Sequence, residues 1–223
     1  MTPDDSIGVL ARITAIFEAV GDEDLGIGVS ELSARVGLPK STVSRLVGGL
    51  VRAHYLERDG TRIRLGLRLF ELGQLAETPR LLRRAALPVM SALCGETGAD
   101  IELSIRDGAD LVRIAVVRGR SPGAAGTESR EPGTAEPSAP VGERTPVRST
   151  VQGRAVLGRS PHAELLPGVD PGAGIAVAVS PVTAMPSGIE AALSATLVTH
   201  DGRGLSRLAS AVDAAATEIA RRL

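Results

Sequence analysis

Apolar residues recur at helical spacing over three consecutive segments near the start of the chain. The first stripe, in residues 6–20, consists of Leu10, Ile13, Phe17 and Val20. Residues 30–36 and 39–53 repeat the pattern, and Gly37 and Pro39 stand between them. Glycine suits the left-handed end of one helix, and proline suits the first position of the next. Two helices joined by so short a turn are typical of a helix-turn-helix.

The pattern then changes to short strands. Two strand-like pieces, 55–57 and 62–65, flank Asp59-Gly60, which is a strong hairpin signal. A helix-turn-helix followed by a hairpin predicts a winged helix-turn-helix. Residues 65–76 return to a helical pattern, with Leu65, Leu69, Leu72 and Leu75 on one face. We interpret this segment as a connecting helix. Its large apolar residues, Phe70 included, predict a dimer contact that it builds together with the first helix.

The remaining chain mixes helical and alternating patterns, so the fold class is α+β. Helices are expected at 80–94, 151–157 and 205–223, and strands at 101–105, 111–117, 175–179 and 191–198. Residues 121–146 contain five prolines and almost no large apolar side chain, which predicts a mobile loop. The expected domains are 1–66 for the winged helix-turn-helix, 67–79 for the linker helix and 80–223 for the α+β domain.

Charge distribution points to nucleic acid although the net charge is only −1. Residues 31–70 hold eight basic and three acidic residues, a local excess of +5. The third helix turns Lys40, Ser41, Thr42, Ser44 and Arg45 outward if its apolar residues face inward. Such a helix fits the major groove of double-stranded DNA. The candidate contacts from the wing are Arg58, Arg62 and Arg64.

Composition excludes several other classes. Three aromatic residues and no Trp argue against a base-stacking binder of single strands. A lone cysteine and three scattered histidines show no metal-ligand spacing, and no phosphate loop, dinucleotide fingerprint or nucleophile elbow occurs. We expect no metal, no cofactor and no enzymatic activity. With no apolar run of membrane length and an acidic N-terminus, we expect a cytoplasmic protein without a membrane partner.

With these motifs, the sequence resembles the IclR family of bacterial transcriptional regulators. Its residues 32–46 are similar to the family's recognition motif, with Gly37-Leu38-Pro39-Lys40-Ser41-Thr42-Val43 followed by Arg45-Leu46. Residues 63–73 look like its wing-to-linker segment. A stretch similar to a loop of its effector domain contains Gly142, Pro146, Thr150, Gly153 and Ala155. The resemblance implies a dimeric regulator with an N-terminal DNA-binding domain and a C-terminal GAF-like domain that senses a small molecule.

The chain also departs from the family pattern. His54 stands where the family usually has glycine before the wing. The segment 159–173 is much shorter than its family counterpart, so the effector domain is expected to be shortened and its pocket more open to water.

The start of the helix expected at 151–157 predicts an anion site. Free N–H groups at a helix start favour an anion, and Arg148 and Arg154 flank this one. We expect a small organic acid to bind near Thr150, with Gln152 and Gly153 beside it. The candidate apolar walls of this pocket are Ile101, Leu103 and Val177.

The leading hypothesis is therefore a sequence-specific DNA-binding regulator, controlled by a small anionic effector and bound to an operator with two related half-sites. The alternative is a small-molecule-binding or enzymatic α+β domain whose N-terminal helices only dimerise. The outward face of residues 40–52 favours the first, because a dimer helix has no need of it. A domain kept only for oligomerisation remains open, as does the choice between dimer and tetramer.

Overall fold

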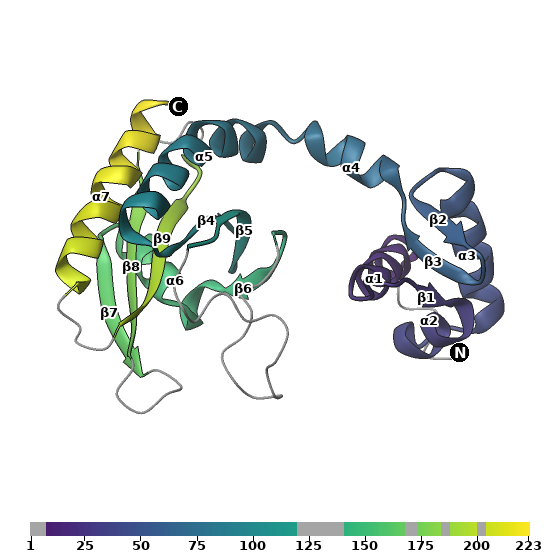
Figure 1. The fold of residues 1–223 in the computed structure, drawn as a ribbon. Coiled ribbons are helices and arrows are strands. Elements are labelled where there is room, and N and C mark those ends of the chain that lie inside the picture. Colours follow the sequence, from purple (N-terminus) through teal and green to yellow (C-terminus); the bar gives the residue numbers. More distant parts are fainter. Residues whose placement is uncertain (1–7, 120–140, 168–173, 184–187, 200–203) are drawn as a thin grey trace. The chain divides into compact units, whose positions relative to one another are not determined.

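The computed structural model describes residues 8–119, 141–167, 174–183, 188–199 and 204–223 (Figure 1). The chain divides into two compact units, Met1–Glu77 and Thr78–Leu223. Within the described ranges, no helix is both long and apolar enough to cross a membrane.

In the described part of the first unit, three helices and a small sheet form the core. The helices are α1 (Val9–Gly21), α2 (Val29–Val36) and α3 (Lys40–Arg52), close to the predicted bounds. The stripe predicted for α1 is only partly right, because Leu10 is 77% exposed while Ile16, Ala19 and Val20 are buried. Those three residues pack with Leu32, Val43 and Val47 in one core.

The predicted hairpin is present as β2 (Leu56–Asp59) and β3 (Arg62–Leu65). Asp59 pairs with Arg62, so the connecting loop is Gly60-Thr61, and Gly60 has a φ of 61°. A third strand, β1 (Ile27–Gly28), adds to the other edge of β3 and was not predicted. The connecting helix α4 (Leu67–Gln74) contains no buried residue.

The second unit is built on an antiparallel six-stranded sheet of order β6-β5-β4-β9-β8-β7 (Figure 1). Its strands are β4 (Asp100–Asp107), β5 (Asp110–Val117), β6 (Arg144–Pro146), β7 (His162–Pro167), β8 (Gly174–Val182) and β9 (Ala191–Thr199). The helices are α5 (Glu77–Thr97), α6 (Val151–Gly158) and α7 (Leu205–Arg221), with a 3₁₀ turn, η2 (Val147–Ser149), before α6.

Two separate cores cover the two faces of this sheet. One lies under α5 and α7 and includes Ile101, Leu103 and Leu193. The other lies under α6 and includes Val147, Val156 and Val177. Because side chains alternate along a strand, neighbouring residues of β8 and β9 contribute to opposite cores.

Three sequence predictions for this unit need correction. The segment expected to be a mobile loop at 121–146 ends in a strand, since β6 pairs with β5 and Arg144 forms ion pairs with Asp107 and Asp110. Residues 120–140 of that prediction lie outside the described part of the chain. The segment 159–173, expected to be a short connection, contains β7, which pairs with β8 along its whole length. The helix expected at 80–94 is longer and continues through Pro88.

Candidate nucleic-acid interface and effector site

The turn between α2 and α3 is held by a specific set of contacts. Gly37 ends α2 with a φ of 65° and a ψ of 25°, the left-handed conformation predicted for it. Ser33 donates its hydroxyl to the carbonyl of Leu38 at 2.6 Å, and the Leu38 N–H donates back to the Ser33 carbonyl at 3.2 Å. These bonds fix how α3 leaves the turn, and so which of its residues face outward.

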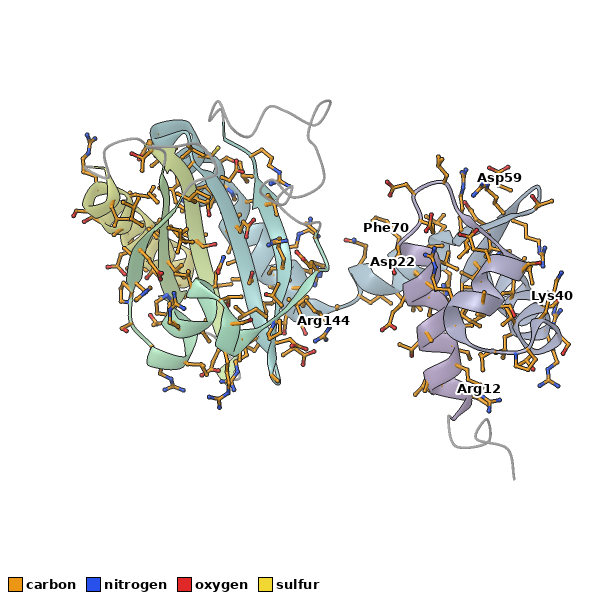
Figure 2. All side chains as sticks on the ribbon, turned by 90° about the horizontal axis from the view of Figure 1, so that it is seen from below. Arg12, Asp22, Lys40, Asp59, Phe70 and Arg144 are labelled. Carbon is orange, nitrogen blue, oxygen red and sulfur yellow. The ribbon has the colours of Figure 1, made fainter. Side chains whose placement is uncertain are left out.

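The predicted recognition face of α3 is turned outward. Lys40, Ser41, Ser44 and Arg45 are exposed and Thr42 is half-buried, while Val43, Val47 and Leu50 point into the core. Figure 2 shows Lys40 at the outer margin of the first unit. Among the described residues of this unit, Lys40, Ser41, Ser44 and Arg45 remain exposed, so this polar face is available to a partner.

Ion pairing separates the basic residues of the first unit into two groups. Three arginines are engaged by carboxylates: Arg35 by Glu23 at 2.7 Å, Arg64 by Asp59 at 3.1 Å and Arg68 by Glu71 at 2.8 Å. Within the described residues of this unit, four basic side chains have neither an ion pair nor a hydrogen bond, and these are Lys40, Arg45, Arg52 and Arg58. All four lie on α3 or the wing. The unpaired positive charge is therefore concentrated where the sequence predicts the DNA contact.

Two of the three predicted wing contacts have other partners. The Nη1 of Arg62 donates to the carbonyl of Gly26 at 2.6 Å, which connects the wing to the residue before β1. Arg64 is paired with Asp59 as described above. Of the wing residues, Arg58 is exposed and unengaged among the described residues, so it is the best placed to meet a phosphate.

In the second unit, the predicted effector residues do not line one pocket. Ile101 and Leu103 belong to the core under α5 and α7, whereas Val177 belongs to the core under α6. A pocket beside Thr150, which caps α6, cannot include the first two as walls. The alternation of β4 was predicted correctly. The walls were wrong because nothing in the local sequence shows which helix covers which face of the strand.

Thr150 and Gly153 have structural roles at the start of α6. The Thr150 hydroxyl accepts a hydrogen bond from the Gly153 N–H at 2.9 Å, so that N–H is already satisfied. A Cβ at Gly153 would lie 1.5 Å from the carbonyl oxygen of Val147, which only glycine avoids. The part of the predicted anion site that rests on this N–H is therefore occupied by the chain itself.

The other predicted effector residues lie around α6 and differ in their contacts and orientation. Arg154 is paired with Glu164 on β7, and Arg148 is exposed. Gln152 donates its amide to the Ser194 hydroxyl at 3.4 Å and so points toward the sheet. Of this set, Gln152 faces the interior, while the two arginines face outward.

Sequence reasoning missed a buried polar cluster on the α6 side of the sheet. Glu102, Ser104 and Ser194 are 8%, 7% and 1% exposed. The Nε of Arg113 lies 3.2 Å from Glu102, and its Nη1 donates to Glu143. Glu102 and Ser104 alternate with Ile101 and Leu103, so the strand pattern alone offered a signal for them. The carboxylates of Glu102 and Glu143 both pair with the one guanidinium of Arg113, so these three side chains have a net charge of −1.

The described residues contain no grouping of histidine, cysteine and carboxylate side chains able to hold a metal ion. The one cysteine, Cys94, is half-buried and its thiol lies 3.3 Å from the carbonyl of Arg118.

Comparison with known proteins identifies a DNA-binding domain and relatives that are transcriptional regulators. Residues 9–60 match the IclR helix-turn-helix domain. The transcriptional regulator KipR of Bacillus subtilis is 31% identical over 138 residues, which cover 61% of this chain and 50% of that protein. KdgR of Dickeya chrysanthemi is 36% identical over 115 residues, or 49% of this chain and 36% of that protein. The chain thus spans half or less of the length of these curated relatives.

Solved structures match over nearly the whole chain. An IclR homologue from Microbacterium hydrocarbonoxydans, complexed with 4-hydroxybenzoate, superposes with a TM-score of 0.76 at 20% identity, covering 97% of this chain and 99% of that one. The Thermotoga maritima IclR superposes with a TM-score of 0.66 at 18% identity, covering 96% and 98%. These structures confirm the α+β fold, and the domain match with the curated relatives confirms the resemblance to IclR regulators.

Proposed function

We propose that this chain, whose residues 9–60 are an IclR helix-turn-helix domain, is a sequence-specific DNA-binding transcriptional regulator of the IclR type. The observation that carries the proposal is the distribution of unpaired charge. Lys40 and Arg45 project from the exposed face of α3 without a carboxylate partner among the described residues, and Arg58 does so from the wing. A helix that served only to dimerise would not keep such a face.

The chemistry of this face suits double-stranded DNA. A recognition helix places its N-terminal residues toward base edges in the major groove. Arg45 has the planar fork that binds O6 and N7 of guanine. Ser41 and Ser44 supply hydroxyls for phosphates, and Arg58 supplies a charge beside the groove. The curated relatives are regulators rather than enzymes, and the proposed activity needs no cofactor. We propose that the chain acts in the cytoplasm, because a bacterial regulator meets its DNA there.

A dimer accounts for the apolar surface of α4. Phe70 is 63% exposed and Leu75 is 75% exposed, although α4 buries nothing within its own unit. Large apolar residues on one helix favour contact with a second copy. Leu72, at 37% exposed, is a further large apolar residue of this helix. Two copies would present two recognition helices, and the operator would then contain two related half-sites.

A salt-dependent binding assay tests the DNA-binding proposal. The full chain selects duplexes from a random pool, and its affinity is measured at several salt concentrations. Replacing Arg45 with alanine should weaken binding to the selected duplex by about 1–3 kcal/mol and relax the choice at one base position. Arg35→Ala is the matched control, because Arg35 is engaged by Glu23 and lies on α2. Selection of no duplex by the wild-type chain would reject the proposal.

We further propose that the second unit binds a small organic acid on the α6 side of its sheet. Gln152 supplies an inward amide beside Ser194, and Arg148, exposed just before α6, has no carboxylate partner among the described residues and can attract an acid. Val177 belongs to the apolar core on the same side.

A thermal-shift screen of small carboxylates, 4-hydroxybenzoate included, tests this second proposal. A ligand at 100 times its dissociation constant adds about 2.7 kcal/mol of stability. Gln152→Ala should abolish the shift. An unchanged shift in that variant would move the site elsewhere, and no shift from any acid would favour a domain used for oligomerisation.

A further inference from the structure

We propose that Arg52 binds a DNA phosphate. We further propose that Gly48 and Gly49, which have no side chains, let the DNA backbone approach α3 closely. This inference rests on the proposed function. It adds a contact that neither the sequence motif nor the wing assigned. It also explains why two glycines occupy consecutive interior positions of a helix, where glycine is unfavourable.

The geometry places the Arg52 guanidinium over the two glycines. An ideal Cβ on Gly48 would lie 3.7 Å from Nη1 of Arg52, and one on Gly49 would lie 4.0 Å from Nη2. Long side chains of a helix lean back over the preceding turn, which brings position 52 over 48 and 49. The guanidinium therefore lies along the helix surface beside the two glycines.

The position of Arg52 relative to Arg45 fits one side of the major groove. Both residues are exposed, and the glycine pair lies between them in sequence. Seven residues of α-helix rise about 10 Å, which is comparable to the groove width of about 12 Å. With Arg45 at the base edges, Arg52 reaches the phosphates that border the groove. Side chains at 48 and 49 would stand between the helix and that strand.

Arg52 differs from several other arginines of the unit because no carboxylate pairs with it. Arg35, Arg64 and Arg68 are held by carboxylates, whereas Arg52 has no partner within the described residues. It lies in the last turn of α3, where a positive charge offsets the helix dipole. A role limited to the dipole predicts a change in stability alone, and this difference makes the proposal testable.

The test measures DNA affinity and thermal stability of the same full-length variants. The duplex is one selected by the wild-type chain, and a scrambled duplex is measured beside it. Arg52→Ala should weaken binding to both duplexes on the order of tenfold, and the log–log salt slope should fall by about 0.9, as for one lost phosphate contact. Arg35→Ala serves as the control and should leave the slope unchanged. Arg52→Gln, which keeps most of the aliphatic stem, should repeat the result if alanine disturbs folding.

The double substitution Gly48→Ala and Gly49→Ala separates an effect on helix stability from an effect on DNA affinity. Alanine should raise the melting temperature, because it favours the helix, yet it should lower DNA affinity at least severalfold. A raised melting temperature with unchanged affinity would overturn the role of the glycines, and an unchanged salt slope in Arg52→Ala would overturn the phosphate contact. Wild-type chain that selects no duplex would instead reject the proposed function. Normal selection with only Arg45→Ala impaired would reject this inference alone.

Discussion

Arg62→Ala should destabilise the wing and not only weaken DNA binding. Its Nη1 donates to the carbonyl of Gly26 at 2.6 Å. Gly26 has a φ of 76° and directly precedes β1, which pairs with β3 through only Ile27 and Gly28. So short a strand has few bonds of its own, and the Arg62 contact is a large part of what holds this edge of the sheet.

The magnitude follows from the type of bond. A hydrogen bond from a charged donor contributes about 1.5–3 kcal/mol when buried. This one is only partly buried, so we expect Arg62→Ala to cost about 1–2 kcal/mol. For a domain of this size each kcal/mol lowers the melting temperature by about 4–8 °C. The exposed Arg58 has no partner within the described residues, and its removal should change stability by less than about 0.5 kcal/mol.

Hydrogen exchange locates the effect. The amides of Ile27 and Gly28 should exchange about tenfold faster in Arg62→Ala, since about 1.4 kcal/mol corresponds to a factor of ten. Arg58→Ala should leave those amides and the melting temperature unchanged while it lowers DNA affinity. Equal exchange in wild type and Arg62→Ala, or equal destabilisation by both variants, would refute the reasoning.

Three further predictions follow from other contacts. Phe70→Ser should shift the chain toward monomer in sedimentation experiments, and a wild-type chain that is monomeric at micromolar concentration would contradict this. Arg106 holds the pKa of Glu190 below its ordinary value. Glu190→Gln should therefore reduce stability above about pH 4.3, and the loss should disappear as the pH falls through the lowered pKa, in pH-dependent melting. Gly153→Ala should cost more than about 3 kcal/mol in chemical denaturation, because its Cβ meets the Val147 carbonyl; a smaller loss would mean that η2 yields.

Local signals allowed the first unit to be predicted from sequence. Gly37 and Pro39 mark the turn, and Val43, Val47 and Leu50 repeat at helical spacing, so each element is encoded within its own residues. The strand β1 escaped prediction because two residues carry no period. Its existence depends on pairing with Ile63, which lies far along the chain.

The second unit was predicted less well because its site depends on long-range pairing. The alternation of Ile101 and Leu103 identifies a strand, but only the packing of α5, α6 and α7 decides which face each residue covers. The same limit applies to side chains. No local pattern shows that Arg62 reaches Gly26, or that Arg113 lies between Glu102 and Glu143.

The strand order of the second unit has a consequence for synthesis. Its central pair joins β4 to β9, with Ile101 opposite Ala195, so this pair cannot form until residues 191–199 have left the ribosome. Pairing over such sequence separation is slow. The unit Met1–Glu77 is complete much earlier, and its core lies within its own length. Domains fold as they emerge, N-terminal first. The recognition helix is therefore expected to be folded while the sheet of the second unit is still unpaired.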